Sequence, residues 1–161
     1  MKKLLLAAGL AALLGACAGN PFNAYTVQPG TARDAVIARL GQPTRVVLLP
    51  AGERLQYSLQ PFGQSAWMVD LDASGRVVRS RQVLTAADFN RIEVGKWTRA
   101  DVEREFGPPA MIDRVASWNG PILTYRWNDG SDMFYFVYLD NANVVRRAHP
   151  GTEFHDAPDR D

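Results

Sequence analysis

The stretch Thr31-Ala-Arg-Asp-Ala-Val-Ile-Ala-Arg-Leu-Gly-Gln-Pro43 decides the fold, because the chain contains a second version of it. The second version, 66 residues further on, is Trp97-Thr-Arg-Ala-Asp-Val-Glu-Arg-Glu-Phe-Gly-Pro-Pro109. An arginine, a valine, a large apolar residue, a glycine and a proline recur in the same order. Beyond these stretches the offset becomes 68, as a two-residue loop insertion produces, and Tyr57 then matches Tyr125. The ordered matches predict two tandem copies of one structural unit.

Each copy begins with a predicted helix, over residues 31–40 and 98–106. Val36 and Leu40 lie four positions apart and form an apolar stripe that one face of a helix buries. The second helix has a threonine at its predicted N-cap and Asp101 three residues later, the pattern of a capping box. A glycine and then a proline end each helix, because glycine adopts the left-handed conformation and proline cannot continue a helix. These residues are Gly41, Pro43, Gly107 and Pro109.

Short β-rich segments follow each helix and are separated by turn residues. The expected strands are 44–49, 54–59, 65–71 and 76–83 in the first copy and 110–117, 122–127, 133–139 and 143–148 in the second. Consecutive short turns favour an antiparallel meander with the helix packed on one face. The predicted fold class is therefore α+β, made of two tandem helix-plus-antiparallel-sheet repeats.

The predicted boundaries follow from this pattern and from the composition of the two ends. Residues 149–161 contain two prolines and scattered charges, so we expect a disordered tail. The predicted organisation is a signal peptide at 1–16, a tether at 17–26, a first repeat at 27–84, a linker with one helical turn at 85–93, a second repeat at 94–148 and the tail at 149–161.

The first sixteen residues have the three parts of a secretory signal. Lys2 and Lys3 are cationic, and the apolar run from Leu4 to Leu14 is shorter than the roughly 20 residues that a membrane-spanning helix needs. Small residues then lead to Cys17, and Leu14-Gly-Ala-Cys17 resembles the bacterial lipobox. The resemblance implies cleavage between Ala16 and Cys17 and attachment of a diacylglycerol to the cysteine.

Cys17 is the only cysteine in the 161 residues, so it cannot form an internal disulfide in an exported protein. Several acyl chains on one cysteine give a durable hold on a lipid bilayer. The next residue is Ala18 and not the aspartate that retains many lipoproteins in the inner membrane. We therefore expect a lipid-anchored protein of the outer membrane that faces the periplasm.

The helix that ends in Leu40-Gly-Gln-Pro43, the strand with Tyr57 and the hairpin Val69-Asp-Leu-Asp-Ala-Ser-Gly-Arg-Val-Val78 together resemble the SmpA/OmlA (BamE-like) outer-membrane lipoproteins. The chain also looks like the β-lactamase inhibitory protein, which has two such units in tandem. The likeness covers nearly all of residues 27–148. It implies a fold that holds other proteins and a link to outer-membrane assembly, although the single-unit members differ from this two-unit chain.

Composition and motifs give little support to other classes of function. Without Lys2 and Lys3, 16 basic residues face 17 acidic ones, so clustered charge for nucleic acid is missing. No Cys/His nucleophile pair exists, and no enzyme activity, cofactor or small-molecule substrate is expected. Asp70-Leu-Asp-Ala-Ser-Gly75 resembles the start of a calcium loop, but Arg81 occupies the position of the bidentate glutamate. A β-turn is the favoured interpretation, and no metal site is expected.

The aromatic residues of the second copy exceed what two small cores need. Alternation along the strand places Phe134 and Phe136 on one sheet face and Tyr135 with Val137 on the other. One interpretation is a core between the repeats, and the other is a protein-binding surface, where tryptophan, tyrosine and arginine concentrate binding energy. The candidate binding residues are Trp97, Trp118, Trp127, Phe134 and Tyr135.

The expected function is a non-catalytic protein-binding or scaffold component of the cell envelope, active in outer-membrane assembly or integrity. Its expected partners are the bilayer, through acylated Cys17, and an envelope protein. The alternative is a periplasmic hydrolase inhibitor that resembles the β-lactamase inhibitory protein. A purely structural envelope protein is a third possibility. An inhibitor presents one exposed loop or an aromatic sheet face to an enzyme cleft, whereas an assembly factor copurifies with barrel-insertion components.

Overall fold

The computed structural model describes residues 20–153. These residues form two four-stranded antiparallel sheets and a few short helices, so the fold class is mixed α+β. The signal peptide predicted at 1–16 and the lipid-attachment residue Cys17 lie outside the described residues.

Both sheets are meanders, because the strands of each sheet lie side by side in chain order and every neighbouring pair is antiparallel. The short turns of the sequence favour this arrangement. The first sheet contains β1 (Arg45–Leu49), β2 (Gly52–Ser58), β3 (Ala66–Asp72) and β4 (Val77–Gln82). The second contains β5 (Met111–Asp113), β6 (Ile122–Asn128), β7 (Asp132–Leu139) and β8 (Val145–Thr152).

The described helices are the 3-10 helix η2 (Pro21–Thr26) and the α-helices α1 (Arg33–Leu40), α2 (Ala86–Phe89) and α3 (Arg99–Phe106). The capping box predicted for the last helix is confirmed, since the Thr98 hydroxyl accepts from the Asp101 backbone N–H and the Asp101 carboxylate accepts from the Thr98 backbone N–H. Helix α1 begins two residues later than predicted. The reason is that the Thr31 carbonyl accepts from the Val77 N–H at 2.9 Å, which holds the chain extended there.

The two predicted helix ends have the same geometry. Gly41 has φ 83° and Gly107 has φ 81°, a left-handed backbone that favours glycine. In each case the glycine carbonyl accepts a hydrogen bond from a tyrosine hydroxyl of the following sheet. The Tyr57 hydroxyl donates to Gly41 at 3.1 Å, and the Tyr125 hydroxyl donates to Gly107 at 2.9 Å.

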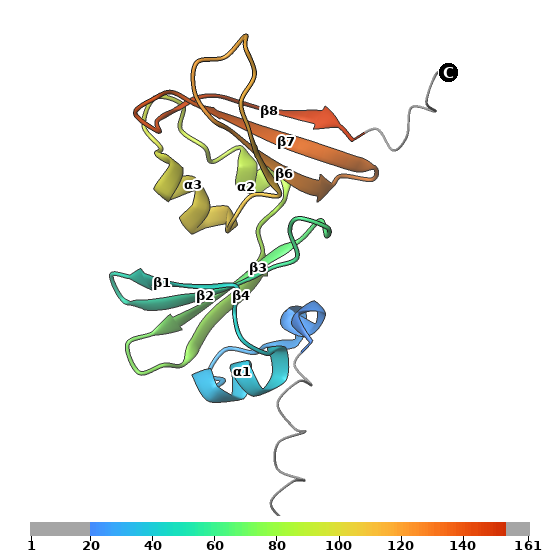
Figure 1. Cartoon of the computed structure of the whole chain (residues 1–161). Coiled ribbons are helices and arrows are strands. Elements are labelled where there is room, and N and C mark those ends of the chain that lie inside the picture. Colours follow the sequence, from blue (N-terminus) through green and yellow to red (C-terminus); the bar gives the residue numbers. More distant parts are fainter. Residues whose placement is uncertain (1–19, 154–161) are drawn as a thin grey trace, which may run out of the picture.

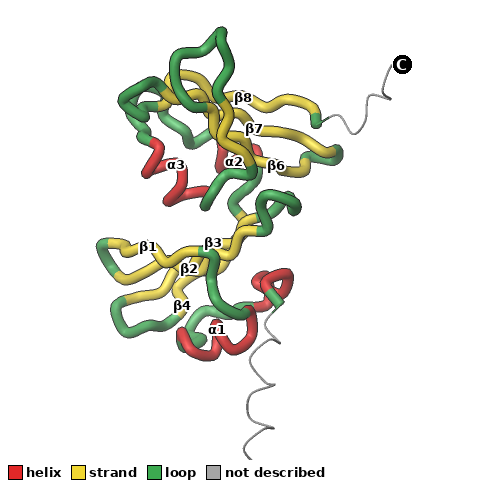
Figure 2. The backbone as a smooth tube through the Cα atoms, in the orientation of Figure 1, coloured by secondary structure: helices red, strands yellow, loops and turns green. Residues whose placement is uncertain are grey.

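The elements stack in four layers, visible from bottom to top in Figure 1. Helix α1 and η2 form the first layer, the sheet β1–β4 the second, α2 and α3 the third, and the sheet β5–β8 the fourth. Figure 2 shows the long loop between β5 and β6 rising above the fourth layer. The first sheet therefore lies between two helical layers, whereas the second sheet contacts a helical layer on one face.

Two apolar cores correspond to these layers. The first joins η2 and α1 to one face of the first sheet, and the second joins α2 and α3 to the inner face of the second sheet. Ala66 and Met68 of β3 belong to the second core, so the first sheet packs on both faces. The first core includes Val36, Leu40, Leu55, Tyr57, Val69 and Leu71; the second includes Phe89, Phe106, Leu123, Tyr125, Trp127, Tyr135, Val137 and Leu139.

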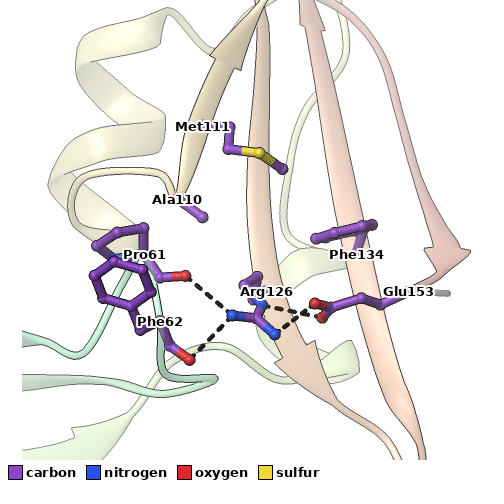
Figure 3. Close-up of a pocket in the computed structure, with 7 residues that line it drawn as sticks. All are labelled: Pro61, Phe62, Ala110, Met111, Arg126, Phe134 and Glu153. Carbon is purple, nitrogen blue, oxygen red and sulfur yellow. Dashed lines mark hydrogen bonds and ion pairs between the residues drawn. The ribbon is translucent and has the colours of Figure 1, made fainter. Parts of the chain in front are cut away.

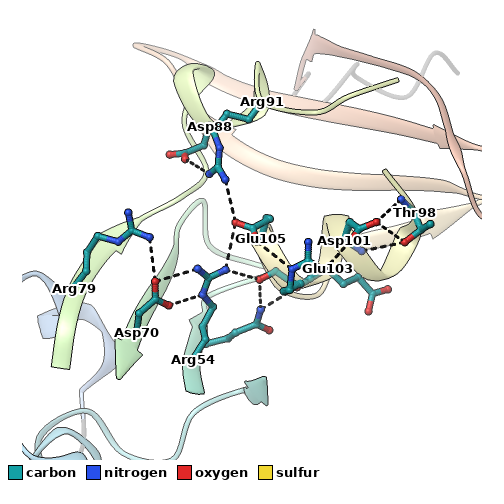
Figure 4. Close-up of polar contacts among 11 residues, drawn as sticks. Arg54, Asp70, Arg79, Asp88, Arg91, Thr98, Asp101, Glu103 and Glu105 are labelled. Atoms are coloured by element: carbon teal, nitrogen blue, oxygen red, sulfur yellow. Dashed lines mark hydrogen bonds and ion pairs between the residues drawn. The ribbon is translucent and has the colours of Figure 1, made fainter. Parts of the chain in front are cut away.

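A polar network joins the first sheet to the carboxyl end of α3 (Figure 4). The buried Arg54 guanidinium binds both carboxylate oxygens of Asp70, at 2.6 and 3.1 Å. It also donates to the Arg104 carbonyl at 3.0 Å, and the Gln56 amide donates to the Glu103 and Arg104 carbonyls. The Arg104 carbonyl is one of those that a helix end leaves without an intrahelical partner, whereas the Glu103 carbonyl also accepts from the Gly107 N–H at 3.0 Å.

The arginines of this network keep its carboxyl groups ionised. Burial raises the pKa of Asp70, but the hydrogen bonds and charges of Arg54 and Arg79 outweigh burial and hold it below its usual range. Burial also tends to raise the pKa of Glu105, but Arg54, Arg104 and Arg91 outweigh burial and hold this pKa below its ordinary value. Attraction between opposite charges therefore holds α3 against the first sheet.

Three predicted boundaries differ from the structure. Residues 21–26, predicted as tether, form η2, and Ala24 is buried in the first core. Residues 86–89 form the helical turn predicted in the linker, but Phe89 fills the second core. Residues 149–152, predicted as tail, belong to β8. An edge strand accommodates Pro150 because, among residues 20–153, no strand pairs with the outer side of β8.

The segment that resembles a calcium loop is a β-turn between β3 and β4. One Asp72 carboxylate oxygen accepts from the Ser74 N–H at 2.9 Å, the Ser74 hydroxyl at 2.7 Å and the Arg76 N–H at 3.0 Å. Asp70 points instead to Arg54. The two carboxylates therefore do not converge, and the favoured turn interpretation agrees with the geometry.

Candidate functional site

The two faces of β7 differ in exposure. Tyr135, Val137 and Leu139 are buried against α2 and α3, whereas the alternate side chains of the strand are only half-buried. The predicted division of this strand between two faces is therefore confirmed. The half-buried side chains lie on the outer face of the second sheet, on the far side from α3, and are Phe134, Phe136 and Tyr138.

An aromatic row extends across this outer face. The ring of Phe136 lies 5.8 Å from that of Phe134 and 6.5 Å from that of Tyr138. His149 of β8 completes the row, because its ring stacks on Tyr138 at 5.4 Å and contacts Phe136 at 5.6 Å. We define these four residues, together with Trp118 and Arg147, as the aromatic face.

Trp118 and Arg147 hold one end of the aromatic face in place. The Trp118 ring meets Tyr138 edge-on at 5.2 Å, and its indole N–H donates to the Leu139 carbonyl at 2.8 Å. The Arg147 guanidinium lies 3.8 Å from the centre of the Tyr138 ring and 5.3 Å from that of Trp118. Such cation–π contacts keep an exposed arginine ordered beside rings that a partner can also contact.

Gly151 shows that the face depends on residues outside the predicted second repeat. An added Cβ at this position would lie 2.7 Å from the Phe136 ring. Glycine therefore leaves the space that the Phe136 ring occupies beside β8. The opposite residue in the register is Phe134, so β8 supports two rings of the face.

A groove of about 330 Å³ borders the face at Phe134 (Figure 3). Arg126 lines it, and the guanidinium of this residue binds Glu153 and donates to the Phe62 carbonyl at 3.1 Å. Phe62 is 87% exposed, although its backbone is held by this arginine. The lining is mostly apolar and comprises Pro61, Phe62, Ala110, Met111, Arg126, Phe134 and Glu153.

The five predicted binding residues separate into two groups. Trp118 and Phe134 belong to the aromatic face. The prediction is wrong for Trp127 and Tyr135, which are 3% and 7% exposed and pack on Phe89 of α2, the latter stacked at 3.9 Å. Trp97 is half-buried, and it packs on the second core through Phe106 at 6.1 Å.

The candidate binding residues left out other members of the site. The two-residue period placed Phe136 on the face of Phe134, and the same period extends to Tyr138, but neither residue was among the candidates. His149 lay in the predicted tail, and Arg147 lay at the end of a strand. Phe62 was assigned to a turn, and no local signal shows that this turn meets the second sheet.

The site suits the binding of a polypeptide surface. Half-buried aromatic rings with an ordered arginine are the groups that concentrate energy at protein interfaces. Within residues 20–153 no group of three histidine, cysteine, aspartate or glutamate side chains is placed to hold a metal ion. No helix in that same range is long and apolar enough to span a bilayer.

Comparisons with known proteins give one distant likeness to report. No family model matches the chain, and no curated protein sequence matches it. A solved structure of a DUF4309 family protein (YjgB) from Bacillus subtilis subsp. subtilis str. 168 is 15% identical, with a TM-score of 0.31. The match covers 83% of this chain and 93% of that one.

Proposed function

We propose that this chain is a lipid-anchored, non-catalytic protein-binding component of the outer membrane that faces the periplasm and serves in envelope assembly or integrity. The observation that supports a binding function is the aromatic face, a row of half-buried rings on the outer side of the second sheet. The lipobox-like sequence that ends at Cys17 supports the anchor.

We also propose that the two halves are tandem copies of one helix–sheet unit. In the first sheet, Arg54 of β2 lies opposite Asp70 of β3. In the second sheet, Ile122 of β6 lies opposite Tyr138 of β7, and each residue of this pair is 68 positions after its counterpart in the first. Both sheets have an irregularity in register directly after these pairs. The Tyr-to-Gly hydrogen bonds at both helix ends repeat as well. This repetition supports the resemblance to the SmpA/OmlA lipoproteins and to the β-lactamase inhibitory protein.

If the two sheets are equivalent, the aromatic face has a counterpart in the first sheet. Positions Arg54, Gln56 and Met68 of the first sheet correspond to Ile122, Thr124 and Phe136 of the second. In the first sheet, this face binds α3 of the following unit. The second sheet has the corresponding face on the outer side of the stack. Ile122 and Thr124 are buried there, so the side chains that a separate protein can contact are the half-buried Phe134, Phe136 and Tyr138.

Photo-crosslinking from the membrane-bound chain tests the binding function. A photoreactive phenylalanine analogue at Phe134 is expected to form an adduct with a barrel-insertion component in intact cells. The same analogue at Leu48, an 84% exposed residue of β1, is the matched control. Equal adducts from both positions, or adducts from neither, would refute the assignment of the aromatic face.

Metabolic labelling tests the anchor separately. The wild-type chain is expected to incorporate a palmitate analogue and to fractionate with the outer membrane, whereas Cys17→Ser is expected to lose both properties. A wild-type chain without label, found free in the periplasm, would remove the anchor while the crosslinking result still decides the binding function.

The exposed Phe62 favours hydrolase inhibition as the second candidate. Its loop projects beside a groove, and Arg126 braces it through two backbone carbonyls, a rigid presentation that suits insertion into an enzyme cleft. The inhibitor hypothesis predicts stoichiometric inhibition of a periplasmic hydrolase that Phe62→Ala weakens at least about tenfold, an effect of a single interface hot spot. A scaffold without inhibitory function leaves every tested hydrolase active.

A further inference from the structure

Helix η2 exposes its large rings and buries its small side chains. A 3-10 helix has three residues per turn, so residues three apart lie on one face. Ala24 and Val27, which are 0% and 5% exposed, pack in the first core. Phe22 and Tyr25 form the opposite face and are 65% and 64% exposed. Packing of the described chain leaves this aromatic pair turned outward.

The surrounding sequence has no charge. Between Lys3 and Arg33 the chain contains no lysine, arginine, aspartate or glutamate. Charged side chains are the costly ones to bring into a bilayer, whereas aromatic rings are enriched at the membrane–water interface. The composition of the segment that contains η2 therefore suits contact with lipid.

The position of η2 close to Cys17 brings it to the membrane. Asn20, the first described residue, is fixed to the end of α1, since its N–H donates to the Arg39 carbonyl at 3.1 Å. Only two residues separate it from Cys17, so the Cα atoms of residues 17 and 20 lie at most roughly 10 Å apart even when the chain is extended. A headgroup layer is about 5–7 Å thick. A lipid held by Cys17 thus leaves η2 too little chain to stand clear of the surface.

We propose that the Phe22–Tyr25 face of η2 lies in the interfacial layer of the membrane to which Cys17 is anchored; the inference rests on the anchoring proposed above. The acyl chains hold the protein at the bilayer, and the two rings orient it. Helix η2 belongs to the first layer of the stack and the aromatic face is the outer side of the fourth (Figure 1). Contact through η2 therefore directs the aromatic face toward the periplasm.

Fluorescence quenching on the intact lipoprotein tests this orientation. Cys17 is the only native cysteine, so acylation leaves an introduced cysteine as the one site for a thiol-reactive dye. The reporter positions are Gln28→Cys, directly after η2, and Ser131→Cys, in the turn between β6 and β7; both are exposed. The labelled lipoproteins are placed in phosphatidylethanolamine/phosphatidylglycerol vesicles that contain a headgroup spin-labelled lipid. Intact mass measures acylation of the same samples.

The dye at position 28 is expected to be quenched about threefold more than the dye at 131, because an interfacial segment lies only about 5–10 Å from the headgroup boundary. Phe22→Ser with Tyr25→Ser is expected to reduce quenching at position 28 but to leave it above the level at 131, because the short chain to Cys17 still holds η2 near the surface. Leu48→Ser, which removes an exposed apolar side chain far from η2 in sequence, is expected to leave quenching at position 28 unchanged. Near-ultraviolet circular dichroism checks that each variant retains its tertiary packing.

The outcomes separate the two proposals. Acylated protein with equal quenching at positions 28 and 131 overturns the membrane contact of η2 and leaves the anchor intact. Acylated protein whose quenching at position 28 is unchanged by the loss of both rings overturns the role of Phe22 and Tyr25. Protein of unacylated mass that does not bind vesicles overturns the anchor, and the orientation that depends on it is then also wrong.

Discussion

Replacement of Arg54 by alanine tests whether the polar network holds the two halves together. Arg54 is 4% exposed and forms two hydrogen bonds to Asp70 and one to the Arg104 carbonyl of α3. It also lies 3.4 Å from the Glu105 carboxylate. The truncation therefore removes one cation from beside two partly buried carboxylates and one helix-end carbonyl.

The expected loss follows from the partners that remain. Removing one partner of a buried ion pair costs about 3–5 kcal/mol, because the other charge stays buried. Asp70 retains Arg79 at 3.1 Å, and the Arg104 carbonyl retains the Gln56 amide at 3.0 Å. These contacts place the loss near the lower limit, at about 3 kcal/mol in the free energy of unfolding. For a domain of this size the midpoint of thermal unfolding then falls by roughly 6–12 °C.

Urea unfolding followed by circular dichroism measures this free energy. Arg54→Met combined with Asp70→Leu is expected to recover most of the loss, since apolar side chains of similar size often replace a buried ion pair without penalty. Arg146→Ala is the matched control: its ion pair with Asp140 has a length of 2.7 Å but is solvent-exposed, so no measurable change is expected. An Arg54→Ala protein as stable as the Arg146→Ala protein would refute the reasoning.

Three further predictions concern stability and are measured by the same urea titration. Gly120→Ala is expected to lower the free energy of unfolding by about 3 kcal/mol or more, because its Cβ would lie 2.0 Å from the Leu139 carbonyl oxygen. Gly130→Ala, with φ +80° but open space around the added Cβ, is expected to lower it by about 1 kcal/mol. Tyr125→Phe is expected to cost about 1–2 kcal/mol, because it deletes a buried 2.9 Å hydrogen bond to a helix-end carbonyl. Asp70 has a lowered folded-state pKa, so its stabilising effect is complete above the unfolded value of about 3.9 and disappears as the pH falls through the folded value. The difference in unfolding free energy between wild type and Asp70→Asn is therefore expected to be constant near neutral pH and to shrink below about pH 4. A difference that grows as the pH falls would contradict a lowered pKa of Asp70 in the folded state.

Local signals explain why the sequence predicted much of the fold. The capping box of Thr98 and Asp101 and the positive-φ glycines at 41 and 107 act within a few residues, and the structure has all of them. Short turns likewise specified both meanders. The segment 21–26 was missed because η2 is too short for a helical period, and its packing on α1 is a non-local contact.

The candidate site was predicted less well because its inner and outer sides depend on distant residues. The two-residue period of β7 separates Phe134 from Tyr135 but contains no information about which of them faces the core. Phe89 of α2 decides this, because it stacks on Tyr135 at 3.9 Å. Helix α2 is 46 residues away in the sequence, so a reading of the strand alone could not assign Trp127 and Tyr135 to the core.

The composition of the corresponding faces of the two sheets reflects what each one contacts. The face of the first sheet that receives α3 contains Arg54, Gln56 and Asp70, because the end of a helix presents carbonyls and, here, the acidic Glu105. A surface matched to those groups must be rich in donors. The corresponding positions of the second sheet are Ile122, Thr124 and Tyr138, none of which is charged, and the one ordered arginine lies at the edge of the face. If the two halves are copies, as we propose, the second sheet therefore favours a partner that presents an apolar surface over one that presents the carbonyls of a helix end. The double substitution Ile122→Arg with Tyr138→Asp introduces the residue types of the first sheet. It is therefore expected to abolish the crosslink from Phe134, and the introduced charges are not expected to bind the same partner.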